Sequence, residues 1–391
     1  MLKKKYWMIA TSFLLLAGCQ AEDDNVNDDP PQEDNQEEIP EENTEDTNDM
    51  TDITEADDET NDETDISDEE NVSQELMDWM PLLENVEYVY TSDYGEEALD
   101  GYTTSRYPQF NSESTQQFSI RGYENTTVNI YEHQEDAVVN VFSREETFFR
   151  DNFLETDYPS PVEEQPVLQL PIEEGNSWSG SDNAEFEITD TQVMIETPVG
   201  SFESIEVTMT QGDLTEINYY AEGIGLVQQT IAYNEEGADP SEVTLIEINE
   251  DVPEMREITL YPLDAEGMSL IQQQVTLNLY TNENQIDPLT DLLRESGLFT
   301  ENAQINSMYL DTQGVIQLDI NQAFIDESSA GSGIESLIIQ GIVNTVSQLY
   351  GSIPSVALSI DGGPYTSGHI TFEENEVLEP DFENVIIEES P

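Results

Sequence analysis

Basic residues and thiols are nearly absent from this sequence. It has one cysteine, Cys19, two histidines, and nine lysine and arginine residues against 87 aspartate and glutamate residues. All three lysines stand at positions 3–5, so the chain after Cys19 has six arginines and a net charge of 6 − 87 = −81. With a single cysteine, the chain can form neither an intrachain disulfide nor a metal site built from several thiolates.

The same scarcity argues against catalysis. Nucleophilic catalysis needs an activated serine, cysteine or lysine beside a base, and only His133 and His369 offer an imidazole. We expect both to be ordinary strand or surface residues, and we expect Trp79 and Trp178 in the core. Paired carboxylates, as in glycosidases, arise by chance among so many acids. We therefore predict that the chain is not an enzyme and has no cofactor and no metal site.

The acidic charge restricts the possible partners. A nucleic acid would be repelled, so nucleic-acid binding is excluded. The carboxylates could serve calcium or a basic partner, or they could keep the protein hydrated in salty or alkaline surroundings. We favour the second interpretation because the acids are spread along the whole chain.

The N-terminus has the pattern of a lipoprotein signal peptide. Three lysines precede an apolar run, Tyr6 to Leu16, that is too short to span a bilayer core of about 30 Å as a helix. The run ends in Leu16-Ala17-Gly18-Cys19, which is a lipobox. We predict that residues 1–18 are removed and that Cys19 carries the lipid anchor. The protein would then lie on the extracytoplasmic face of the cell membrane.

A long acidic segment follows the predicted anchor. Residues 20–70 contain 25 acidic residues, no basic residue and no aromatic residue. Such a segment buries too little apolar surface to offset its chain entropy. We predict that residues 19–75 form a disordered tether.

The rest of the chain predicts an α+β protein with two domains and an acidic tail at 381–391. Residues 76–252 favour an antiparallel, β-rich domain, with a turn at Pro198-Val199-Gly200 and one helix over Arg144 to Leu154. The strands that we expect there are Gln116–Ile120, Thr127–Tyr131, Ala137–Phe142, Gln192–Glu196, Ser204–Thr210, Ile217–Tyr220, Leu226–Tyr233 and Val243–Ile248. The segment from Pro198 to Val227 is similar to β-rich domains of bacterial extracytoplasmic lipoproteins.

Residues 253–380 predict a smaller β-α-β-β-α-β domain in which two helices cover one face of a mostly antiparallel sheet. Asp287 is expected to cap the first helix, and Ser332 and Glu335 are expected to form a capping box for the second. The second helix has an apolar stripe with Gly341 and Thr345 as its small members. The predicted elements are Gln274–Tyr280, Asp287–Gly297, Ile305–Leu310, Val315–Ile320, Ser332–Leu349 and Ser355–Ile360.

This order and these residues resemble the GerMN domain of the GerM sporulation and germination lipoproteins. The resemblance rests on the first strand, on Val315 to Ile320 leading into Ala323-Phe324, and on the last strand running into Asp361-Gly362-Gly363. It also rests on three residues of the second helix, Gln340, Thr345 and Gln348. The resemblance implies an assembly module that docks through a free sheet face or edge strand, with protein partners or with copies of itself.

Two functions therefore remain open. The chain could be an envelope lipoprotein that acts by protein–protein assembly in sporulation or spore germination. Alternatively, its β-rich domain could hold a hydrophobic ligand or lipid in a half-barrel. A deep apolar cavity of several hundred Å³ would favour the second function.

Overall fold

The computed structural model describes residues 73–93, 102–122, 125–155, 160, 162–234, 239–328, 330–351, 354–383 and 385–387. The predicted signal peptide, Cys19 and nearly all of the predicted tether lie outside these residues. The described chain is mostly β-structure, and its described residues belong to one compact unit.

A nearly closed antiparallel sheet of twelve strands, which we call the curled sheet, occupies most of residues 86–250. Its order in space is β6-β5-β4-β3-β2-β1-β12-β11-β10-β9-β8-β7. The chain therefore forms two meanders that meet where β1 pairs with β12. The strands are β1 (Val86–Asp93), β2 (Tyr102–Asn111), β3 (Thr115–Arg121), β4 (Thr126–His133), β5 (Ala137–Arg144), β6 (Gln165–Gln169), β7 (Ser177–Ser179), β8 (Glu185–Thr197), β9 (Gly200–Gln211), β10 (Leu214–Ala221), β11 (Gly225–Tyr233) and β12 (Ser241–Glu250), with the short 3-10 helix η1 (Ser181–Asn183) after β7.

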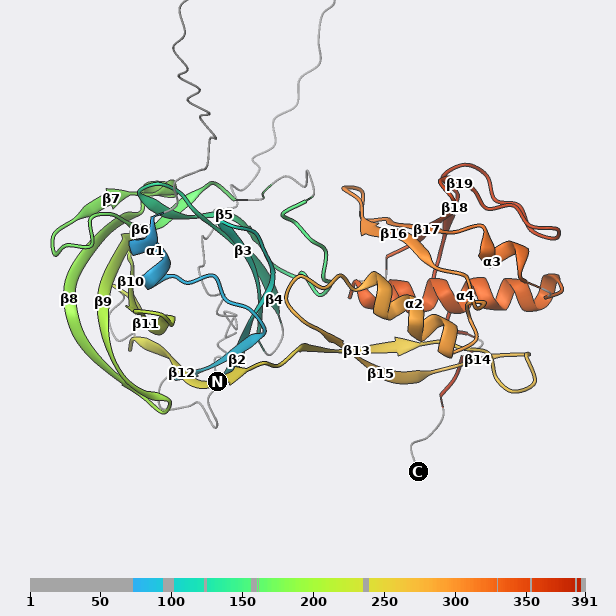
Figure 1. The fold of residues 1–391 in the computed structure, drawn as a ribbon, viewed down its shortest axis with the longest axis horizontal. Helices are drawn as coiled ribbons and strands as arrows, with labels where there is room; N and C mark the ends of the chain where they lie inside the picture. Colours follow the sequence, from blue (N-terminus) through green and yellow to red (C-terminus); the bar gives the residue numbers. More distant parts are fainter. Residues whose placement is uncertain are drawn as a thin grey trace, which may run out of the picture. The chain divides into compact units, whose positions relative to one another are not determined.

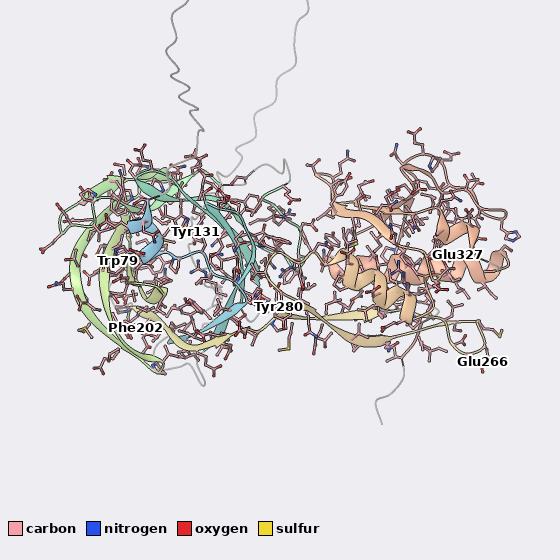
Figure 2. The ribbon with its side chains drawn as sticks, in the orientation of Figure 1. Trp79, Tyr131, Phe202, Glu266, Tyr280 and Glu327 are labelled. Atoms are coloured by element: carbon pink, nitrogen blue, oxygen red, sulfur yellow. The ribbon has the colours of Figure 1, made fainter. Side chains whose placement is uncertain are left out.

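The curled sheet wraps around a short helix, α1 (Gln74–Trp79), as Figure 1 shows. Leu76 of this helix is fully buried in a core with aromatic residues of the sheet, and the side chains of Trp79 and Tyr131 lie in the same interior (Figure 2). Side chains bridge the two end strands, since Trp178 Nε1 donates to Pro166 O at 3.0 Å. The sheet is therefore closed by side-chain contacts and by α1, with no backbone ladder between β6 and β7.

The predicted strands of this region all lie within observed ones, but the predicted helix over Arg144 to Leu154 is wrong. Arg144 ends β5, and an irregular loop follows. Glu146 has a φ of 53°, which interrupts a helix, and Thr147 N donates to Thr126 O. Tertiary contacts therefore override the local helical preference.

The C-terminal module, residues 254–387, contains the predicted β-α-β-β-α-β series with additions at both ends. Its strands are β13 (Glu254–Leu260), β14 (Leu270–Ile271), β15 (Gln273–Leu279), β16 (Ile305–Leu310), β17 (Ile316–Ile320), β18 (Val356–Ile360), β19 (Gly363–Pro364), β20 (Val377–Leu378) and β21 (Val385–Ile386), and its helices are α2 (Ile286–Glu295), α3 (Ala323–Asp326) and α4 (Ser332–Leu349).

These strands do not form the single sheet that the sequence predicted. Among the described strands, β13 pairs with β15 alone, whereas β16, β17, β18, β19 and β20 form a second, larger sheet in which β17 and β18 are parallel. The two-residue strands β14 and β21 form a separate short pair. Helices α2 and α4 lie between the two sheets in Figure 1. A helix between two sheets must bury more than one face, which explains why polar residues such as Asn344 and Ser347 of α4 are buried.

A close approach explains the small residues of α4. A Cβ placed on Gly341 would lie 2.4 Å from the backbone oxygen of Tyr261. One turn later, Thr345 Oγ1 accepts a hydrogen bond from Tyr261 N at 3.1 Å. The segment after β13 therefore lies directly against the backbone of α4.

Both predicted helix caps differ from the structure. Asn284 Oδ1 accepts hydrogen bonds from the first backbone N–H groups of α2, so Asn284 caps that helix in place of Asp287. Helix α4 has no side-chain cap. The buried carboxylate of Glu335 instead accepts a hydrogen bond from Tyr365 OH at 2.7 Å, which turns it toward the core and away from the helix end.

Part of the predicted acidic tail packs on the module. Asn344 exchanges hydrogen bonds with the backbone of Asp381, and the Phe382 ring contacts Tyr261. β21 then pairs with β14 in parallel. The described part of the segment 381–391 is therefore structured through residue 387.

Candidate functional site at the junction of the curled sheet and the C-terminal module

One hydrophobic core joins the curled sheet to the C-terminal module. Val128 and Ile130 of β4 and Phe142 of β5 lie in a buried cluster with the apolar residues of β13, α2 and α4. The loop after β5 adds Phe149 and Phe153, and Phe149 packs on Tyr350 with ring centroids 4.7 Å apart. The outer wall of the curled sheet thus serves as part of the core of the module.

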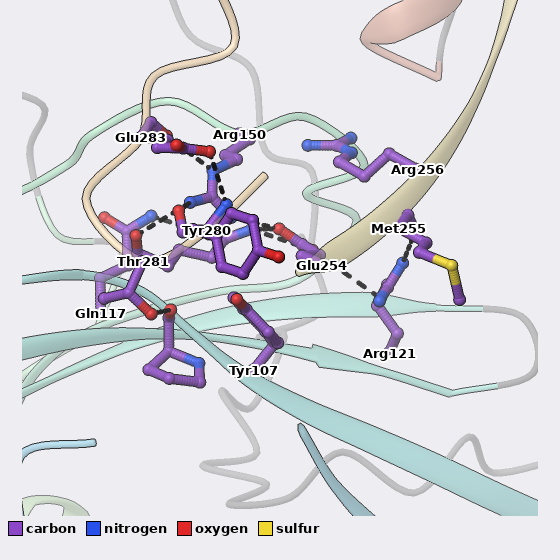
Figure 3. Close-up of polar contacts among 12 residues, drawn as sticks. Tyr107, Gln117, Arg121, Arg150, Glu254, Met255, Arg256, Tyr280, Thr281 and Glu283 are labelled. Atoms are coloured by element: carbon purple, nitrogen blue, oxygen red, sulfur yellow. Dashed lines mark hydrogen bonds and ion pairs between the residues drawn. The ribbon is translucent and has the colours of Figure 1, made fainter. Parts of the chain in front are cut away.

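A buried ion pair lies at the centre of this junction (Figure 3). Arg150 Nη1 lies 2.5 Å from Glu254 Oε2, and both side chains are almost fully buried. The other Arg150 nitrogens donate to the backbone oxygens of Gln109, Tyr280 and Glu283. A buried charge is costly unless it is paired and hydrogen-bonded, and Arg150 meets both conditions.

The carboxylate of Glu254 is surrounded by cations. Burial alone would raise its pKa, but the guanidinium groups of Arg256, Arg150 and Arg121 outweigh burial and hold the pKa below its ordinary value. Gln109 Nε2 also donates to this carboxylate at 3.1 Å. Glu254 is therefore charged at neutral pH and neutralises only part of the positive charge around it.

Hydrogen bonds between backbone and side chains complete the junction. Asn85 and Thr281 bond reciprocally, since Asn85 N donates to Thr281 Oγ1 at 2.8 Å and Thr281 N donates to Asn85 Oδ1 at 2.9 Å. Tyr107 OH donates to the backbone oxygen of Val252 in the link between β12 and β13. The boundary that the sequence places at 252/253 therefore lies in a short link held by the curled sheet.

Asp151 is a second buried acid at the junction. Its carboxylate accepts hydrogen bonds from Tyr350 OH at 3.0 Å and from Leu310 N at 3.4 Å. Burial raises its pKa to about 6, and these hydrogen bonds lower the pKa only in part. The folded protein thus holds a proton on Asp151 at pH values where the unfolded chain has lost it.

Replacing Asp151 with asparagine tests this proton. From pH 5 to pH 8 the folded wild type loses its Asp151 proton at a cost, because its pKa of about 6 lies above the ordinary value of 3.8. Asp151→Asn has no such cost. The free energy of unfolding of the variant minus that of wild type should therefore increase by about 1 kcal/mol between pH 5 and pH 8. Urea unfolding of both proteins at the two pH values measures the difference, and an unchanged difference would contradict a raised pKa.

A pocket with a volume of about 280 Å³ opens beside Glu254. It lies between the outer face of β2–β4, the loop after β5, β13 and the C-terminal end of α4. Its wall includes two arginines and several neutral hydrogen-bonding side chains. The lining residues are Gln109, Ser119, Arg121, Thr126, Thr147, Phe148, Phe149, Glu254, Arg256, Glu257, Ile258, Gln348, Leu349 and Gly351.

The apolar interior of the curled sheet contains a few buried polar groups. Two described cavities there have volumes of about 20 and 30 Å³, and the Arg106 side chain lines both. Glu216 lines the larger one, where burial raises its pKa against hydrogen bonds from Asn218 and Gln229. Cavities of this size hold about one or two water molecules.

A partly free strand edge is present on the C-terminal module. Among the described strands, β16 is an end strand of its sheet and pairs with β17 alone, while Ile305 N and Leu310 N donate to Thr290 Oγ1 and Asp151 Oδ2 and leave the edge between them free. The Tyr309 ring of β16 is exposed. Exposed edge strands offer backbone groups to an added strand.

The residues singled out in the sequence occupy separate places. Cys19 lies outside the described residues. His133 is buried in β4, with its ring nitrogens near the backbone oxygens of Met80 and Ser114, whereas His369 is exposed. Trp178 is buried and Trp79 packs against the same core. No group of three or more metal-ligating side chains occurs in the described part of the chain.

The second-helix residues behind the GerM resemblance hold neighbouring segments. Thr345 bonds Tyr261, and Gln340 Nε2 donates to the backbone oxygen of Glu379 at 3.2 Å. Gln348 lines the junction pocket. No motif in the sequence indicates the junction itself, although the scarcity of arginine is a usable signal. Four of the six arginines after Cys19 contribute to this region, namely Arg121, Arg144, Arg150 and Arg256.

Part of the C-terminal module matches a known protein family. Residues 259–366 match the Germane family, described as sporulation and spore germination. The Germane segment, as we call these residues, runs from within β13 to just after β19 and contains α2, α3 and α4. The match agrees with the resemblance to sporulation and germination proteins found in the sequence. A search of curated proteins finds no match.

Three solved structures show weak similarity. One is a Bacteroides fragilis protein described as exported with a YmcC-like fold (12% identity, 43% of this chain, 97% of that chain, TM-score 0.26). One is a Parabacteroides distasonis protein described as a lipoprotein (12% identity, 43% and 96%, TM-score 0.25). The third is the Pseudomonas aeruginosa MucA/MucB complex (6% identity, 45% and 56%, TM-score 0.23). Similarities at these TM-scores carry no argument about fold or function.

The described residues contain no helix that is long and apolar enough to cross a membrane.

Proposed function

We propose that this chain is an envelope lipoprotein that acts in sporulation or spore germination as a protein–protein assembly module. The supporting observation is the Germane match over residues 259–366. In this proposal the chain is not an enzyme, and Cys19 carries a lipid that holds it on the extracytoplasmic face of the cell membrane. The acidic segment after Cys19 separates the folded part from the lipid surface.

The free edge of β16 is the docking element in this proposal. A neighbouring strand can add to such an edge through backbone hydrogen bonds, and side chains such as Tyr309 then select the partner. Anchoring copies in a membrane confines them to two dimensions and raises their effective concentration. Weak edge contacts can therefore produce assembly without a large interface.

The ligand-binding alternative is not favoured by the cavities described inside the curled sheet. Their volumes of about 20 and 30 Å³ are far below the several hundred Å³ that a lipid or other hydrophobic ligand occupies. Arg106 and Glu216 also place polar groups in this interior. We therefore assign the function to the outer surface of the protein.

Complementation of a gene deletion tests the proposal. We expect deletion to lower spore yield or germination at least about tenfold and the wild-type gene to restore it. Tyr309→Glu should fail to restore it, because a charge on the β16 edge opposes strand addition. Cys19→Ser should also fail, because it removes the anchor. Counts of heat-resistant spores and of germinated spores measure both steps.

Tyr233→Glu is the matched control for the edge variant. Tyr233 has an exposed fraction of 44% against 47% for Tyr309, but it belongs to the interior strand β11 of the curled sheet. It should restore the wild-type counts. Normal sporulation and germination in the deletion strain would contradict the proposed role, and full complementation by Tyr309→Glu would contradict docking through β16.

A further inference from the structure

Three of the six arginines after Cys19 are gathered around one carboxylate, that of Glu254. Among the described residues Arg121 and Arg150 pair with Glu254, Arg294 pairs with Asp291, and no carboxylate oxygen lies within 4 Å of Arg256. This is unexpected in a chain with 87 acidic residues. Ordinary charge pairing would give each arginine its own acid, so the cluster calls for another explanation.

Arg256 uses few of its donors within the protein. Its Nη2 donates to the backbone oxygen of Phe148, whereas a guanidinium group carries five N–H donors. The side chain extends from β13 toward Arg150 in Figure 3 and lines the junction pocket. No Arg256 nitrogen is buried without a hydrogen-bond partner, so its remaining donors are accessible to a bound molecule.

The charges around the pocket do not cancel. Arg121, Arg150 and Arg256 contribute three positive charges, and Glu254 and the exposed Glu257 contribute two negative charges. Asp151, which interacts with both Arg256 and Arg144, adds a third negative charge, and Arg144 adds a fourth positive charge. The C-terminal end of α4 adds a partial negative charge at Gln348 and Leu349. Burial lowers the pKa of Arg256, and repulsion from Arg121 and Arg150 lowers it further, against the attraction of Glu254. A surplus of positive charge therefore remains at this place.

The wall of the pocket also offers neutral hydrogen-bonding groups. Ser119, Thr126 and Gln348, which carry hydroxyl or amide groups, belong to its lining, whereas the hydroxyl group of Thr147 already donates to the backbone oxygens of Arg144 and Glu145. The Arg121 side chain is 31% exposed. Arginine forks and hydroxyl donors together are the groups that recognise carboxylate and phosphate oxygens.

We propose that the junction pocket binds a small oxyanion, carried as a carboxylate or phosphate group, between Arg121 and Arg256. A volume of about 280 Å³ admits a small molecule and excludes a folded partner. The strongly acidic chain repels anions elsewhere, so the cluster concentrates anion binding at one position. Because the pocket lies between the curled sheet and the Germane segment, a bound anion would strengthen the junction. The inference is independent of the role in sporulation.

Thermal unfolding of the full-length chain tests the site. Inorganic phosphate and succinate are added separately in sodium chloride at constant ionic strength. At about a hundredfold excess over the dissociation constant, the bound anion should raise the wild-type Tm by about 3 °C or more. A response to phosphate alone identifies a phosphate group as the ligand, and a response to succinate alone identifies a carboxylate.

Four variants separate the site from a general salt effect. Arg256→Gln and Arg121→Gln should weaken anion binding at least about tenfold, because each removes charged hydrogen bonds. Arg294→Gln is the matched control, since Arg294 lies on α2, pairs with Asp291 and does not line the pocket. It should keep the wild-type response. Arg256→Lys keeps the positive charge but loses the planar guanidinium group that can bind two oxygens at once. This variant should stay folded and bind the anion more weakly than wild type.

Two results would overturn the proposal. One is a wild-type Tm that neither anion changes relative to chloride. The other is a shift of equal size in wild type, Arg256→Gln and Arg121→Gln, which would assign the effect to the exclusion of the anions from the protein surface.

Discussion

Replacing Arg150 with methionine should lower the free energy of unfolding by about 3–5 kcal/mol. The substitution leaves the buried carboxylate of Glu254 with a hydrogen bond from Gln109, with Arg121, whose Nε lies 3.8 Å away, and with the more distant charge of Arg256. It also removes the donors that satisfy three backbone oxygens of the junction. Urea unfolding of wild type and variant in the same salt measures the loss.

A control and a double variant show whether the cost comes from the unpaired charge. Arg294→Met removes an exposed pair with Asp291 and should cost at most about 1 kcal/mol. Glu254→Met alone should also destabilise the protein, and the two losses should not add in the double variant, because both substitutions remove the same buried pair. Equal losses for Arg150→Met and Arg294→Met would mean that the junction pair does not stabilise the fold.

Gly341→Ala should destabilise the protein by about 2–3 kcal/mol, although alanine is the better helix former by about 1 kcal/mol. The added Cβ would lie 2.4 Å from the backbone oxygen of Tyr261 and 2.9 Å from Leu298 Cδ2. A backbone oxygen cannot rotate away as a side chain can, so α4 and the segment after β13 must move apart. The hydrogen bond between Tyr261 N and Thr345 should weaken at the same time.

Gly333→Ala provides the matched comparison within α4. No heavy atom lies within 4 Å of the Cβ position at Gly333, so the substitution should gain up to about 1 kcal/mol from helix propensity alone. Opposite signs for the two variants are expected in urea unfolding. A gain at both positions would show that α4 and Tyr261 are not in close contact.

Local sequence signals predicted the elements whose cause is local. The glycine in Pro198-Val199-Gly200 marks the turn between β8 and β9. The apolar stripe of α4 also placed that helix correctly over Ser332–Leu349. Turn residues and periodicity act over a few positions, so a single sequence is enough to predict these features.

Features that depend on distant residues could not be predicted. Helix α1 has only six residues, which is too few to show a repeating apolar pattern in the sequence. It is stabilised by the sheet around it. Arg150 and Glu254 are 104 positions apart, and nothing in their immediate neighbourhoods indicates a pair. The two sheets of the module follow from the position of α4, whereas the chain order alone is compatible with one sheet.

The shared core has a consequence for how such a protein can change over evolutionary time. Because Val128, Ile130 and Phe142 cover apolar residues of the Germane segment, that segment cannot be exchanged between proteins as a free cassette. In another protein, the segment would need an apolar surface of the same shape to pack against. Without it, the residues of β13 and α4 that these side chains cover would be exposed to solvent. The two parts are therefore constrained to be inherited together.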